Sequence, residues 1–90
     1  MSAVDPVLES YRDEITALDA QLIETINRRL ETVLALRRHK EENGIAFYDP
    51  DREAHLVERL KELNEGPLSS QGVEELAAFV LELVKREASA

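Results

Sequence analysis

Two cations in the first half of the chain occupy helix positions where apolar side chains are expected. With about 100° per residue around a helix and Leu22 taken as zero, Arg29 falls at about −20° and Lys40 at about 0°. Both positions lie inside a stripe of aliphatic residues. A buried charge is unfavourable unless it is paired, so each cation must meet a carboxylate or an anionic ligand, or extend its charged end into water.

A second charged group opens the next helical segment. With Leu56 taken as zero, Asp49, Arg52 and Glu53 fall at about 20°, −40° and 60°, within the apolar stripe of that segment. Asp49 can also serve only as a helix cap, and Arg52 with Glu53 can form a structural ion pair. Taken together with the two cations upstream, these residues predict a polar cavity between helices.

The residue types restrict the chemistry of such a cavity. The chain has no cysteine, and its two histidines are too far apart in sequence for a metal-ligand motif. The sequence also shows no serine–histidine pair of the kind that marks an activated nucleophile. Arginine and lysine therefore predict a small polycarboxylate ligand and electrostatic rather than nucleophilic chemistry. The residues alone indicate an anion-binding helical protein.

The elements that hold these residues are predicted to be helices only, because leucine, glutamate, alanine and arginine are abundant and there are three glycines and three prolines. Asp5-Pro6 and Asp49-Pro50 are helix starts, and Ser69 or Ser70 can cap a third helix. Start and stop signals divide a single domain, residues 1–90, into helices over about residues 6–42, 50–64 and 70–87.

The first helix predicts a dimer. It is roughly 50 Å long, and its apolar stripe continues along most of that length. A chain of 90 residues buries too small a core to cover such a stripe. We therefore expect an intertwined homodimer in which the long helices of two copies pair.

Charge and hydropathy exclude several other partners. The net charge of −8 and the lack of a basic patch with interleaved aromatic residues argue against nucleic acid. No apolar run is long enough to cross a bilayer, and the first residues lack a signal-peptide pattern. With no cysteine, the sequence predicts a cytoplasmic protein without membrane partners.

Several segments together resemble a known family. They are residues 11–23, Asn27 to Arg29, Lys40, the run from Tyr48 to Glu53, and the Gly66-Pro67-Leu68-Ser69 lead-in to the last helix. In this combination the chain resembles the AroQ-type, all-helical chorismate mutases over roughly residues 8–70. The resemblance implies a dimer of three-helix subunits with two shared active sites and no cofactor. The implied reaction is the Claisen rearrangement of chorismate to prephenate in phenylalanine and tyrosine biosynthesis.

The resemblance also assigns roles to the charged residues. It implies that Arg12 crosses to the partner's site and that Arg29 binds a substrate carboxylate. Lys40 corresponds to the lysine that hydrogen-bonds the ether oxygen of the breaking bond. Asp49 and Glu53 correspond to the groups that hold the ring hydroxyl, and Arg52 to the adjacent site arginine.

The last helix departs from the family pattern. Where many members carry a serine, this chain has Val84, and the glutamine or glutamate that makes a second contact to the ether oxygen falls on Ala88. Either Glu87 fills that role, which predicts higher activity at lower pH because the carboxylic acid must be protonated to donate, or the second donor is absent. Absence predicts slow turnover or the need for an activating partner enzyme.

Other functions remain open at the level of sequence. A lyase that removes pyruvate from isochorismate would use much the same arginines and lysine, but Asp49 and Glu53 favour the mutase. A mutase of the 4-amino analogue of chorismate is also open, because pocket changes near the ring hydroxyl or in the last helix could accommodate an amine. A weakly active regulatory module of an aromatic-biosynthesis enzyme, or a helical interaction domain without a ligand, are the remaining alternatives, and the latter leaves Arg29, Lys40 and Arg52 unexplained.

Overall fold

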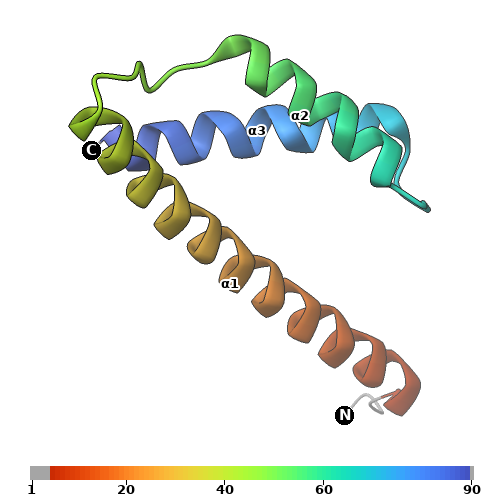
Figure 1. The fold of residues 1–90 in the computed structure, drawn as a ribbon. Helices are drawn as coiled ribbons and strands as arrows, with labels where there is room; N and C mark the ends of the chain where they lie inside the picture. Colours follow the sequence, from red (N-terminus) through yellow and green to blue (C-terminus); the bar gives the residue numbers. More distant parts are fainter. Residues whose placement is uncertain (1–4, 90) are drawn as a thin grey trace.

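The fold consists of three helices. The computed structural model describes residues 5–89, and these form α1 (Pro6–Glu42), α2 (Pro50–Leu63) and α3 (Ser70–Ser89), with no strand among them (Figure 1). The predicted all-helical class, with one very long first helix, is confirmed. The ends of α2 and α3 differ from the predicted ones by one or two residues, as expected where helix ends fray.

Two of the helices begin with the same local signal. Asp5 accepts hydrogen bonds from the backbone N–H groups of Val7 and Leu8 through its carboxylate, and Pro6 is the first residue of α1. Asp49 accepts one from the N–H of Arg52 at 3.1 Å, and Pro50 opens α2. A carboxylate cap satisfies N–H groups that have no partner within the helix, while proline has no such group to leave unpaired.

The connections are formed by residues suited to chain reversal. Asn43 caps the end of α1, and Gly44 follows with a φ of 66°, a left-handed conformation that glycine adopts without strain. Asn64 ends α2 and donates from its side chain to the carbonyl of Leu68 at 2.6 Å. Of the two serines proposed as caps for α3, Ser69 accepts the hydrogen bond, from the N–H of Gly72.

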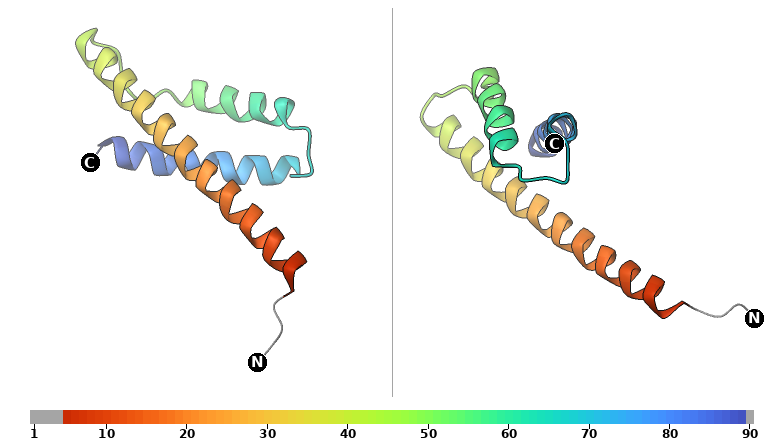
Figure 2. Two further views of the ribbon diagram at one scale, coloured as in Figure 1. Left: turned by 90° about the horizontal axis from the view of Figure 1, so that it is seen from below. Right: turned by 90° about the vertical axis from the view of Figure 1, so that its right-hand side faces the viewer.

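The small core lies on one face of α3. Helices α2 and α3 run side by side in opposite directions, and α3 also packs against the C-terminal half of α1 (Figures 1 and 2). The residues of the described chain that are buried are Val73, Ala77, Val84 and Ala88. Their spacing places them along one side of the helix, between α1 and α2.

The N-terminal half of α1 contacts neither of the other helices and projects away from them (Figures 1 and 2). Its apolar side chains are exposed, including Tyr11 at 62% and Ile15 at 56%. The radius of gyration is 17.8 Å, compared with about 12 Å for a compact domain of this length. Within residues 5–89, no helix combines the length and apolar character that crossing a bilayer requires.

Candidate active site

A cavity of about 340 Å³ opens between the C-terminal half of α1, the segment before α2, the first turns of α2 and the second half of α3. Its lining contains both the charged residues singled out in α1 and those singled out in α2. The predicted site residues that line it are Arg29, Lys40, Asp49, Arg52, Glu53 and Val84. The structure thus brings the charged residues of α1 and α2 that periodicity singled out to a common space.

Helix α1 contributes two half-buried cations to the cavity. Arg29 and Lys40 are separated by about 16 Å along the helix axis, so they lie near opposite ends of the cavity. Lys40 donates from Nζ to the backbone carbonyl of Phe47 at 3.1 Å. An ammonium group has three N–H donors, so this bond orients Lys40 and leaves two donors for a ligand.

Helix α2 contributes its first turn. Asp49 lines the cavity and also caps the helix, so its role as a cap does not remove it from the cavity. A carboxylate can accept about four hydrogen bonds, and the cap uses only part of this capacity. Arg52 is exposed at the rim of the cavity, while Glu53 is half-buried.

The last helix presents a mostly apolar surface at this point. Val84 is 2% exposed and lines the cavity. Glu87 is exposed and lies outside the lining. Ala88 is buried outside the lining as well, and its backbone carbonyl accepts a hydrogen bond from Nη1 of Arg37. The structure therefore brings Val84 to the cavity but neither Glu87 nor Ala88.

Lys85 is the charged residue of the cavity that sequence reasoning missed. Its Nζ lies 3.2 Å from Oε1 of Glu53 and 3.2 Å from Oε1 of Glu82. It also lies 4.7 Å from the centre of the Tyr48 ring, within cation–π range. Burial alone would lower the pKa of Lys85, but the hydrogen bonds to Glu82 and Glu53 outweigh it and the pKa is raised. Its position four residues after Leu81, which also lines the cavity, was the available sequence signal.

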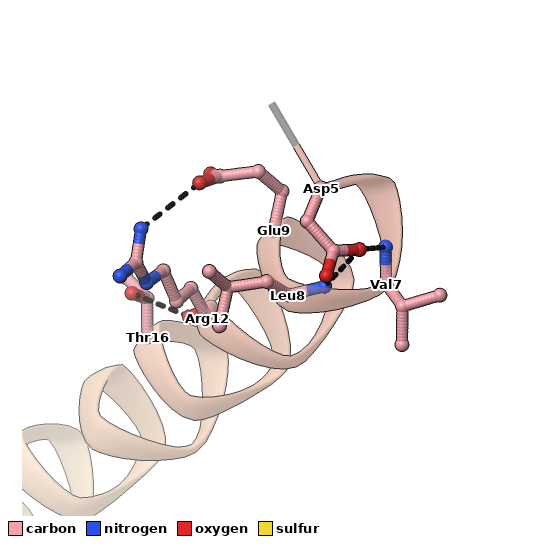
Figure 3. Close-up of polar contacts among 6 residues, drawn as sticks. All are labelled: Asp5, Val7, Leu8, Glu9, Arg12 and Thr16. Carbon is pink, nitrogen blue, oxygen red and sulfur yellow. Dashed lines mark hydrogen bonds and ion pairs between the residues drawn. The ribbon is translucent and has the colours of Figure 1, made fainter. Parts of the chain in front are cut away.

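Arg12 lies far from this cavity. It is exposed on the projecting half of α1 and pairs with Glu9 at 3.1 Å (Figure 3). About 25 Å of helix separates it from Arg29, which is more than an arginine side chain can span. Arg12 therefore cannot reach the cavity of its own chain.

A second, apolar hollow of about 420 Å³ adjoins the first. It lies between α2 and α3, and both hollows are lined by Arg29, Leu56 and Leu81. The remaining lining residues are Leu60, Leu63, Asn64, Val73, Leu76, Ala77 and Val80. Among residues 5–89 no group of three or more histidine, cysteine, aspartate or glutamate side chains is arranged to hold a metal ion.

Comparison with known proteins connects this arrangement to one family. Residues 11–88 match the sequence pattern of the family described as chorismate mutase type II. A bifunctional chorismate mutase/prephenate dehydratase of Neisseria gonorrhoeae is 30% identical over 78 residues, covering 87% of this chain and 21% of the relative. A protein of the same description from Pseudomonas aeruginosa is 34% identical over 74 residues, covering 77% of this chain and 20% of the relative.

A third relative, the T-protein of Haemophilus influenzae, is 34% identical over 70 residues, covering 77% of this chain and 19% of the relative. The chain thus spans about a fifth of the length of the curated relatives that it matches. The family match includes all of α2, most of α1 and α3, and every residue that lines the charged cavity. On this evidence the chain belongs to the chorismate mutase type II family.

Proposed function

We propose that the chain catalyses the rearrangement of chorismate to prephenate. The observation that carries the proposal is the single cavity that joins Arg29 and Lys40 of α1 to Asp49, Arg52 and Glu53 of α2. Four cations and two carboxylates line it, so its net formal charge of +2 complements a dicarboxylate. Membership in the type II family supports the same reaction.

The proposed mechanism needs no proton transfer and no covalent intermediate. In this rearrangement the ether C–O bond breaks while a C–C bond forms within one molecule. Arg29 binds one carboxylate, and Asp49 and Glu53 accept from the ring hydroxyl, which together hold the flexible substrate in its reactive conformer. Lys40, oriented by the Phe47 carbonyl, donates to the ether oxygen as negative charge develops there.

We further propose that the site is completed by a second copy of the chain. Arg12 cannot reach the cavity of its own chain, yet the family resemblance assigns it to substrate binding. The exposed stripe on the same half of α1 needs an apolar partner, and the uncovered hollow between α2 and α3 offers one. In a homodimer the projecting half of α1 would carry Arg12 to the other copy's cavity.

At the last helix we propose that the second donor to the ether oxygen is absent. Glu87 lies outside the cavity lining, and the position expected to carry the donor is Ala88. Lys40 is then the main group that stabilises the developing charge. This assignment predicts turnover slower than that of a site with two donors, without a rise toward acid.

A partner enzyme and a cytoplasmic location remain predictions. The first is supported by relatives whose names join chorismate mutase to prephenate dehydratase. The second rests on the cysteine-free sequence. A lyase acting on isochorismate is the second candidate function, since the same Arg29 and Lys40 would serve it.

The test is the loss of chorismate absorbance with the purified chain, with the product identified by chromatography. Prephenate is expected from chorismate, and isochorismate in a parallel reaction should release no pyruvate. If isochorismate gives pyruvate and chorismate gives no prephenate, the assigned function changes from mutase to lyase. No turnover of either compound by a folded protein would contradict the proposed function.

A further inference from the structure

The second half of α3 supplies a cation at the place where the proposed function puts the substrate's ring hydroxyl. Lys85 is half-buried, and its Nζ reaches across to Oε1 of Glu53 in the first turn of α2 at 3.2 Å. The Tyr48 ring lies against the same ammonium group at 4.7 Å. Lys85 is thus held by two contacts from the start of α2 and the segment before it, at one wall of the cavity.

The ion pair changes what Glu53 can bind. A carboxylate accepts about four hydrogen bonds, so Glu53 can accept from Lys85 and from a substrate hydroxyl at the same time. A substrate ammonium group at that place would instead meet the like charge of Lys85. Because the hydrogen bonds to Glu82 and Glu53 raise the pKa of Lys85 despite its burial, the lysine is charged throughout the neutral range.

We propose that Lys85 is a specificity-determining residue that makes this part of the cavity accept a neutral hydroxyl and reject an ammonium group. The inference rests on the proposed function, because it takes Glu53 as the acceptor for the ring substituent. The two compounds that the inference distinguishes are chorismate and the 4-amino analogue of chorismate, which differ at that substituent. A primary amine carries a proton at neutral pH, so the two compounds differ in charge as well as in shape.

The chain offers a matched control for the structural part of this ion pair. Lys61 also links α2 to α3, through Glu74 at 3.3 Å, and also pairs with a glutamate three residues away on its own helix, Glu58 at 3.3 Å. Lys61 is about as exposed as Lys85 but does not line the cavity. Loss of a cross-helix ion pair alone should therefore be reproduced by Lys61→Met.

The experiment compares kcat/KM for chorismate and for the 4-amino analogue at neutral pH in wild type, Lys85→Met, Lys85→Arg and Lys61→Met. Lys85→Met leaves Glu53 free to pair with the ammonium, so the ratio of the analogue to chorismate should rise on the order of tenfold or more. Lys85→Arg keeps the charge and should keep the wild-type ratio. Lys61→Met should also keep it. If Lys85→Met does not fold, Lys85→Gln carries the same prediction.

The outcomes separate this inference from the proposed function. If wild type converts chorismate and the ratio is the same in Lys85→Met, Lys85 does not determine specificity, while the mutase assignment stands. An equal rise in Lys61→Met would assign the effect to helix packing and would also overturn the inference. If wild type converts neither compound, the proposed function fails and the inference fails with it.

Discussion

The two halves of α1 differ in how their apolar faces are used. In the C-terminal half the stripe packs toward α3 and is interrupted by Arg29 and Lys40, which face the charged cavity. In the N-terminal half the same stripe carries no charged residue within about 40° of the Leu22 direction. It is exposed there, as at Leu18 and Leu22, which are 56% and 52% exposed. One half of the helix therefore lines the charged cavity, while the other presents an exposed apolar surface that, in our proposal, a second copy of the chain covers.

This difference bears on how a chain of 90 residues can be stable with a charged cavity between its helices. Only one face of α3 is buried in the described chain, which is little apolar burial for three helices. The exposed stripe of α1 and the apolar hollow beside the cavity hold the surface that remains to be buried. We infer that dimer formation supplies both the missing stability and the missing Arg12.

The largest expected effect comes from placing a charge in the exposed stripe. Ile15→Glu should weaken the dimer on the order of 10² to 10⁴ fold, because each dimer loses two buried isoleucines and would bury two carboxylates. Sedimentation at micromolar concentration measures it. Ala20→Glu is the matched control, since it adds the same carboxylate at about 160° from the Leu22 direction on the same helix. A stable Ile15→Glu dimer would mean that the stripe is not the interface.

The second-largest effect is expected from a change in the C-terminal half of α1. Lys40→Ala should lower kcat on the order of 10² to 10³ fold while leaving the dimer folded, by analogy with loss of an oxyanion-hole donor. Arg38→Ala, an exposed cation two residues earlier that lies outside the cavity, is the control and should retain activity. Retained activity in Lys40→Ala would remove this lysine from the mechanism. The proposed difference in role between the two halves of α1 would then not hold.

The smallest effect is expected at the end of α3. Glu87→Gln should leave kcat/KM for chorismate unchanged from pH 4.5 to 8.5, because Glu87 is exposed outside the cavity lining. Wild type should likewise show no rise in activity toward acid. An acid rise that disappears in Glu87→Gln would show that α3 moves to bring this carboxylate to the substrate, and would restore the second donor.

Local patterns were sufficient to predict the helices and much of the cavity. Asp5-Pro6 and Asp49-Pro50 act within one helical turn, so their effect can be read from neighbouring residues. The positions of Arg29 and Lys40 follow from helix periodicity alone, because both lie on one rigid element.

The contribution of α3 could not be derived in the same way. Pairing between Lys85 and Glu53 depends on the rotation of α3 relative to α2, which a single sequence does not specify. The same rotation determines that Val84 faces the cavity while Glu87 faces away. Alignment with a family pattern names such positions but does not show which neighbouring charge takes over when the expected polar residue is absent.

The most direct test of a site shared between two chains is to mix two inactive variants. Arg12→Ala and Arg29→Ala should each be inactive alone, since each lacks one carboxylate-binding arginine in both sites. After subunit exchange, mixed dimers contain one intact site, so activity should recover to about a quarter of the wild-type level for random pairing. No recovery, with exchange verified by mass spectrometry, would contradict the account that the projecting half of α1 completes the partner's cavity.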